Sequence, residues 1–145
     1  MTLGIKTVSG FLLRILAGGF ILFMLVIVTI ANRGEGGRWW AFIHSIPCGD
    51  KLGHVGLMGA LCLLCNLAFT PRRLRILPPY ITLVTFILFT VITLEELSQA
   101  FIATRTCDPI DWLADLTGLA LGQMAATVIR KGFHKMSPTT INHTP

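Results

Sequence analysis

A chain of 145 residues is long enough for one domain, and its composition indicates which kind. Hydrophobic residues make up 53% of it and charged residues only 13%, with a mean hydropathy of +0.72, whereas a soluble domain carries about 25% charged residues. This excludes an ordinary soluble domain and predicts a single all-α membrane domain, a bundle of four transmembrane helices in the lipid bilayer. The net charge of +5 does not indicate a nucleic-acid partner, because the basic residues flank apolar runs and do not line one polar face.

The first predicted span covers about residues 11–31 and is interrupted only by Arg14, whose long side chain can reach the lipid headgroups. The apolar run is long for a signal-peptide core, and no clear small-x-small cleavage site follows it, which favours an uncleaved span over a signal peptide. In the polar connection that follows, Trp39 and Trp40 are typical of the membrane–water boundary, and residues 39–46 could form a short interfacial helix.

The other three spans are predicted at about residues 50–69, 79–97 and 109–129. Pro78 and Pro79 suit the first turn of the third span, and residues 136–145 should form a disordered polar tail. Cys62 and Cys65 lie in the middle of the second span without histidines at zinc spacing. We therefore expect two buried, small apolar residues there and not metal ligands.

The distribution of charge predicts how the four spans are oriented. The side shared by both termini carries eight of the twelve basic residues: Lys6, Arg14, Arg72, Arg73, Arg75, Arg130, Lys131 and Lys135. The opposite side carries all seven acidic residues: Glu35, Asp50, Glu95, Glu96, Asp108, Asp111 and Asp115. The positive-inside rule therefore places both termini in the cytoplasm and the acidic ends toward the periplasm or the extracellular space.

Polar side chains gather at the predicted outer ends of the last three spans. They are Asp50, Lys51 and His54 on the second, Glu95, Glu96 and Gln99 on the third, Arg105 and Asp108 in the turn, and Asp111 and Asp115 on the fourth. A charge at the bilayer centre costs roughly 2.5–3.5 kcal/mol, so these groups should pair with one another. On the fourth span the two carboxylates share one stripe with Gly118 and Gly122, and the glycines would let a neighbouring helix press close.

This pattern resembles the VanZ-like family of small bacterial membrane proteins. The matching positions are Asp50, Lys51, His54, Glu96, Gln99, Arg105, Asp108, Asp111, Gly118 and Gly122. The resemblance covers roughly residues 50–122, and the family usually has asparagine where this chain has Asp115. The namesake of the family is associated with resistance to the glycopeptide antibiotic teicoplanin. The resemblance therefore implies a role at the cell envelope, in the bacterial cytoplasmic (inner) membrane, and names no reaction or cofactor.

Several of these residues are candidates for chemistry. His54, oriented by Asp50 or by a carboxylate from another span, could act as a general base, or it could be a neutral histidine hydrogen-bonded within the bundle. The acid would be Glu96 or Glu95 at the end of the apolar third span, and Asp111 is the other catalytic candidate. Lys51, Gln99 and Arg105 would bind an anionic group, such as the phosphate of a lipid-linked envelope precursor. The supporting residues would be Asp50, Asp108, Asp115, Gly118 and Gly122.

Two further interpretations of the cluster are open. A divalent cation could find ligands in His54, Asp50, Glu96, Asp111 and Asp115. With one histidine and no dense motif this signal is weak, so no metal is assigned. Cys48 and Cys107 both fall in the outer loops, where an oxidising compartment would permit a disulfide between them; the alternative is two unpaired thiols.

Two classes of function follow from the sequence. The first is a membrane enzyme or headgroup-binding site that acts on envelope material. The second is a non-catalytic accessory protein, in which Glu96, Arg105 and Asp111 form a structural ion-pair clasp or a docking site for a partner. A channel or pump is not expected, because the interiors of the second and third spans are apolar apart from Asn66 and scattered threonines.

Overall fold

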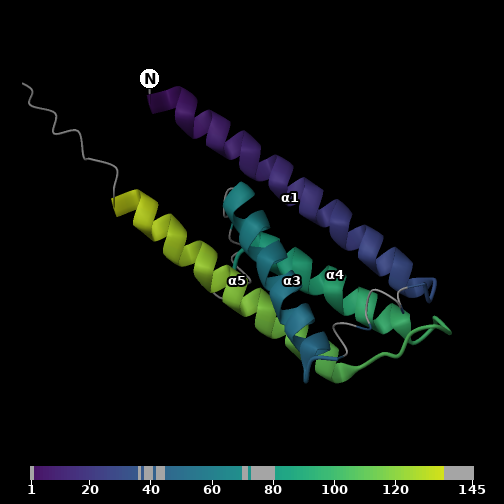
Figure 1. The fold of residues 1–145 in the computed structure, drawn as a ribbon. Coiled ribbons are helices and arrows are strands. Elements are labelled where there is room, and N and C mark those ends of the chain that lie inside the picture. Colours follow the sequence, from purple (N-terminus) through teal and green to yellow (C-terminus); the bar gives the residue numbers. More distant parts are fainter. Residues whose placement is uncertain are drawn as a thin grey trace, which may run out of the picture.

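The computed structural model describes residues 2–35, 37, 41, 45–69, 72 and 81–135, with side chains only between residues 10 and 132. This part of the chain is all-helical, as predicted, and contains α1 (Thr2–Asn32), α3 (Gly49–Ala68), α4 (Leu83–Gln99) and α5 (Pro109–Lys135) (Figure 1). Most of the predicted interfacial helix at 39–46, the two tryptophans, Pro78, Pro79 and the tail at 136–145 lie outside the described residues.

The four helices overlap the four apolar segments expected from the sequence. Three of them contain stretches that are long and apolar enough to cross a membrane: Gly10–Asn32, Gly49–Ala68 and Pro109–Gly132. Helix α4 has 17 residues, which is about 26 Å of helix. It begins after Thr82, whose hydroxyl caps the helix by accepting a hydrogen bond from the backbone N–H of Thr85.

Glycines bring α3 and α5 into backbone contact. A Cβ at residue 118 would lie 2.5 Å from the carbonyl oxygen of Val55 and 2.9 Å from the nitrogen of Gly59, and one at residue 122 would collide with the Gly59 carbonyl. Gly118 and Gly122 therefore admit a neighbouring helix, as their spacing predicted. The sequence did not single out Gly59, the partner residue on α3.

Helix α1 packs chiefly against α3. The contact includes Ala17, which is fully buried in one core cluster with Leu61, Cys65 and Ala68. A second core cluster joins α3, α4 and α5 through Cys62, Ile92 and Leu119. Cys62 and Cys65 are thus buried among apolar side chains, which confirms that they are small core residues.

A neutral hydrogen-bond network, formed by Asn66, Thr82, Thr85 and Gln123, fills one end of the α3–α5 pair. Asn66 donates to the Thr85 hydroxyl over 2.9 Å and accepts from the Thr82 hydroxyl over 2.6 Å, and the Thr85 hydroxyl donates to Gln123. Asn66, Thr82 and Thr85 are buried. Arg130 extends the network by donating to the carbonyls of Asn66 and Phe69, which are left free at the C-terminal end of α3.

Candidate functional site

The opposite end of the bundle gathers the polar residues that the sequence pattern singled out. Helices α3 and α5 begin there and α4 ends there, and residues 100–108 connect α4 to α5 (Figure 1). The topology therefore brings the three sets of polar residues to one depth. We call them together the charged cluster: Asp50, Lys51, His54, Glu95, Glu96, Gln99, Arg105, Asp108, Asp111 and Asp115.

Lys51 is an ion-pair clasp within this cluster. Its ammonium group donates to Asp50 over 3.2 Å, to Asp108 over 2.9 Å and to Asp111, so it ties α3 to the start of α5. The lysine holds the pKa of the Asp108 carboxyl below its usual value of 3.8. Lys51 was predicted to bind an anionic ligand, but three carboxylates surround its ammonium group, and Lys51 does not line the pocket beside His54.

Glu96 organises the connection between α4 and α5. The residue is only 4% exposed, and one of its carboxylate oxygens accepts from the Asp108 backbone N–H over 2.7 Å. The other oxygen accepts from the Gln99 amide over 3.1 Å, and the same amide donates to Glu95 over 3.0 Å. Glu96 was predicted to be a catalytic acid, but both of its oxygens are engaged within the protein and it does not line the pocket.

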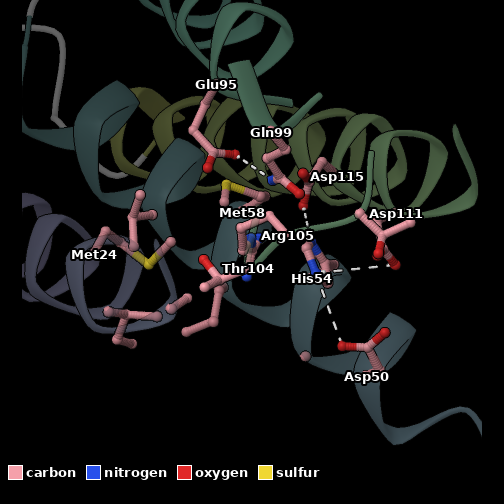
Figure 2. Close-up of a pocket in the computed structure, with 16 residues that line it drawn as sticks. Met24, Asp50, His54, Met58, Glu95, Gln99, Thr104, Arg105, Asp111 and Asp115 are labelled. Carbon is pink, nitrogen blue, oxygen red and sulfur yellow. Dashed lines mark hydrogen bonds and ion pairs between the residues drawn. The ribbon is translucent and has the colours of Figure 1, made fainter. Parts of the chain in front are cut away.

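His54 is positioned by a carboxylate from another helix. Its Nδ1 lies 2.9 Å from Asp115, which is 2% exposed on α5. An ionised carboxylate only accepts hydrogen bonds, so beside an ionised Asp115 the donor in this contact is Nδ1. The Nε2 atom then faces Asp50 and Asp111, with a carboxylate oxygen of each at 4.0 Å (Figure 2). Of the orienting partners considered from the sequence, the structure therefore places Asp115 in this role.

A pocket of about 290 Å³ lies beside His54 and has two unlike walls. The apolar wall is a stripe along α1: Met24, Ile27, Val28 and Ala31. The polar wall includes Asp50, His54, Glu95, Gln99, Arg105, Asp111 and Asp115 (Figure 2). The Thr104 hydroxyl, also in the lining, donates to the carbonyl of Asn32 over 2.6 Å and so links the end of α1 to the α4–α5 connection.

Arg105 lines this pocket, and its guanidinium group has no ion-pair partner among the described residues. Its Nε is buried without a hydrogen-bond partner, and the guanidinium group forms no ion pair with any carboxylate in the part of the chain that the structure describes. One oxygen of Glu95 is also buried without a partner among the described residues. Buried polar groups are normally paired, so this end of the pocket has unused hydrogen-bonding capacity.

The structure does not contain the disulfide that an oxidising compartment would permit between Cys48 and Cys107. Cys48 and Cys107 are both free thiols, which was the alternative left open by the sequence. Cys48 is exposed at the start of α3, whereas the Cys107 thiol interacts with Glu96. Burial and the negative charge of Glu96 raise the pKa of the Cys107 thiol above its usual value.

The ligand set considered for a divalent cation becomes smaller in the structure. Asp50, His54 and Asp111 each offer one ligand atom, and these atoms all lie within 4.8 Å of one another. Glu96 and Asp115 fall outside this group, because Glu96 is bonded to the Asp108 backbone and Asp115 contacts the other nitrogen of His54.

The apolar wall was not predicted from the sequence. Met24, Ile27, Val28 and Ala31 have the spacing of a helix face, but α1 is apolar all round and no polar residues mark that face off. Comparison of the chain with models of known protein families, with curated proteins and with solved structures finds no match.

Proposed function

We propose that this is a four-span protein of a bacterial cytoplasmic membrane that binds the anionic headgroup of a lipid-linked or phosphate-bearing cell-envelope molecule. One observation carries the proposal. The pocket sets an unpaired guanidinium group, Arg105, opposite an apolar wall on α1. Such a pair of walls suits an amphiphile, with its charged end on Arg105 and its hydrocarbon along α1.

Two properties support α4 as the fourth span. Its length of about 26 Å is close to the roughly 30 Å hydrocarbon core. Its outward side chains are apolar and exposed, with Val91 56%, Leu94 62% and Leu97 56% accessible, and lipid would cover them. With four spans, the excess of basic residues on the side of the termini places both termini in the cytoplasm and the pocket on the outer side.

The size of the pocket supports a headgroup as its occupant. Sites that enclose a whole drug-sized ligand measure about 300–1,000 Å³, and this pocket of about 290 Å³ lies at the lower limit. The pocket would therefore hold the phosphate end of a lipid and leave the chain beside α1 in the bilayer. The resemblance to the VanZ-like family supports an envelope role, with teicoplanin resistance as the cellular phenotype to measure.

A structural clasp is a second role, but its members differ from the expected Glu96, Arg105 and Asp111. Arg105 forms no ion pair among the described residues, and Lys51 takes its place. Lys51 joins α3 to α5, and Glu96 fixes the backbone of Asp108. The clasp accounts for these three residues. It leaves the guanidinium group of Arg105 and the Nε2 atom of His54 without a structural role, and both line the pocket.

Binding by the purified protein in detergent tests the proposal. We expect a polyisoprenyl phosphate to bind, and a polyisoprenol of the same chain length or inorganic phosphate alone to bind much more weakly. Arg105→Gln should weaken binding of the lipid phosphate by about 10- to 100-fold, the value of a charge-assisted hydrogen bond. The matched control is Arg33→Gln, at an exposed arginine near the end of α1.

Melting temperatures separate binding from folding in the same experiment. Arg105→Gln should melt at or above the temperature of the wild type, because Arg105 forms no ion pair among the described residues that the substitution could break, and its buried Nε has no partner. If Arg105→Gln binds the lipid phosphate as well as Arg33→Gln does, or if the neutral polyisoprenol binds equally well, the proposal is wrong. A loss of teicoplanin resistance that always accompanies loss of folded protein would favour the clasp alone.

A further inference from the structure

We propose that Asp50, His54 and Asp111 form a binding site for a divalent transition-metal cation such as Mn²⁺ or Zn²⁺, with Asp115 positioning the imidazole ring. A cation could bind to these three residues without a lipid in the pocket, so this proposal is independent of the proposed headgroup binding. Two of its ligands come from successive turns of α3 and the third from the first turn of α5.

The distances around His54 are slightly longer than those of an occupied metal site. Three ligands that each lie about 2.1 Å from one ion can all be at most about 3.6 Å apart. His54 Nε2 lies 4.0 Å from an oxygen of Asp50 and 4.0 Å from an oxygen of Asp111, and the three ligand atoms lie within 4.8 Å of one another. An N–H···O hydrogen bond needs about 2.7–3.2 Å, so a proton on Nε2 would reach neither carboxylate at this separation. An ion would bind all three groups after they move inward by a few tenths of an ångström.

The contact between His54 Nδ1 and Asp115 orients the imidazole ring so that Nε2 faces the proposed cation site. In the neutral imidazole, with the Nδ1 proton directed to Asp115 at 2.9 Å, the lone pair of Nε2 points toward Asp50 and Asp111. Three acceptor atoms thus converge on one point. Metal-ligating histidines commonly donate their second ring N–H to a carboxylate, which fixes the ring and makes it a stronger ligand.

Lys51 does not occupy this point. It contacts Asp50 through Oδ2, whereas Oδ1 is the atom that faces His54. Asp111 is shared between the lysine and the site, since the same oxygen contacts both. The Oδ1 atoms of Asp50 and Asp111 therefore lie near His54 while Lys51 forms its ion pairs.

The charge of the pocket also favours a cation. Its lining contains four carboxylates, those of Asp50, Glu95, Asp111 and Asp115, against the one guanidinium group of Arg105. A divalent cation would offset two of these charges and would reduce the repulsion felt by an anionic headgroup. A mixed set of one imidazole and two carboxylates suits Mn²⁺ or Zn²⁺ better than Mg²⁺ or Ca²⁺, which prefer oxygen ligands alone.

Mn²⁺ added alone to the purified protein tests the site. Electron paramagnetic resonance should count one bound ion, and pulsed measurements should show the nitrogen coupling of a coordinated imidazole. His54→Gln should abolish that coupling, and both His54→Gln and Asp50→Asn should weaken binding by at least about tenfold. The matched control is Glu35→Gln, an exposed acid outside the pocket, which should bind Mn²⁺ like the wild type.

Asp50→Asn is the variant that should remain folded, because the Asp50 side chain is 43% exposed. A loss of Mn²⁺ binding in this variant would therefore not be due to misfolding. Absence of binding at millimolar Mn²⁺ and Zn²⁺, binding without nitrogen coupling, or an unchanged affinity in folded Asp50→Asn would each overturn the proposal. The lipid experiment is independent of this one. Binding of Mn²⁺ without affinity for the polyisoprenyl phosphate would support the metal site and contradict the proposed function. Binding of the polyisoprenyl phosphate without binding of Mn²⁺ would support the proposed function and contradict the metal site.

Discussion

The two ends of the α3–α5 pair carry polar clusters that differ in charge. In the neutral network, Asn66, Thr82, Thr85 and Gln123 are bonded to one another, and the Nε of Arg130 beside them is buried without a partner among the described residues. In the charged cluster, Lys51 and Glu96 are fully engaged, but Arg105 Nε is buried without a partner among the described residues and His54 Nε2 faces two carboxylates beyond hydrogen-bond distance. Arg105 and His54 line the pocket, whereas Arg130 does not.

The difference shows how to separate a structural polar group from a binding one in a small membrane protein. Amides and hydroxyls that form hydrogen bonds with one another hold helices together, and their burial costs little free energy because they are uncharged. Charged groups cost more, and those without a partner lower stability unless a ligand completes them. Arg105 and the Nε2 atom of His54 both line the pocket, so the site should be recognised by incomplete bonding and not by charge alone.

Substitution of Gly122 should have the largest effect, because it disturbs the helix pair that carries both clusters. An added Cβ would collide with the Gly59 carbonyl and would lie 2.9 Å from the Cβ of Cys62. Gly122→Ala should therefore lower the unfolding free energy by about 2–3 kcal/mol, measured by thermal melting in detergent. The control is Gly132→Ala in the same helix, where an added Cβ meets no atom within 4 Å. Equal melting of the two variants would contradict the close contact.

Asp115→Asn should affect the charged cluster alone. An asparagine side chain can still accept the hydrogen bond from His54 but no longer supplies the negative charge. We expect about a tenfold loss of Mn²⁺ affinity with a melting temperature near that of the wild type. An unchanged affinity would mean that Asp115 orients the ring without tuning it.

Asn66→Leu should affect the neutral network alone. Interhelical hydrogen bonds in membrane proteins contribute about 0.6 kcal/mol on average and at most about 1.7 kcal/mol, so we expect a loss of about 1 kcal/mol in unfolding free energy. Binding of Mn²⁺ and of lipid phosphate should not change. If either affinity fell in the folded variant, the two clusters would be coupled and the comparison would fail.

The smallest effect should be a dependence of stability on acid pH. The Asp108 carboxyl has a pKa below 3.8 in the folded protein because of Lys51. Its ion pair therefore contributes full stability above the unfolded-state pKa, and the contribution is lost as the pH falls through the lower folded-state value. Asp108→Asn should remove this part of the acid-induced loss in melting temperature. A melting curve with the same pH dependence in both proteins would contradict the clasp.

The sequence predicted where the polar groups would gather, and it did so for physical reasons. Apolar segments of span length set the depth of each helix end, and helical periodicity sets which residues share a face. These two rules are enough to predict that Asp50, His54 and Asp111 meet, and that Gly118 and Gly122 lie against a neighbouring helix.

The pairing within the cluster could not be predicted in the same way. Asp111 and Asp115 lie one turn apart on the same face, so periodicity cannot decide which of them meets Lys51 and which meets His54. A shift of α5 by about one turn along its axis would change their partners, and the backbone contact at Gly59 fixes that position. Gln123 was missed for a related reason, because a lone polar residue in an apolar helix does not reveal its partners.

The packing of α1 at Ala17 has a consequence for the width of the pocket. Ala17 is fully buried against α3, and the pocket-lining residues lie seven to fourteen positions further along the helix, about 10–21 Å away. A change of about 5° in the angle between α1 and α3 at Ala17 would move this wall by about 1–2 Å. The packing of a single small residue distant from the site therefore contributes to the width of the pocket.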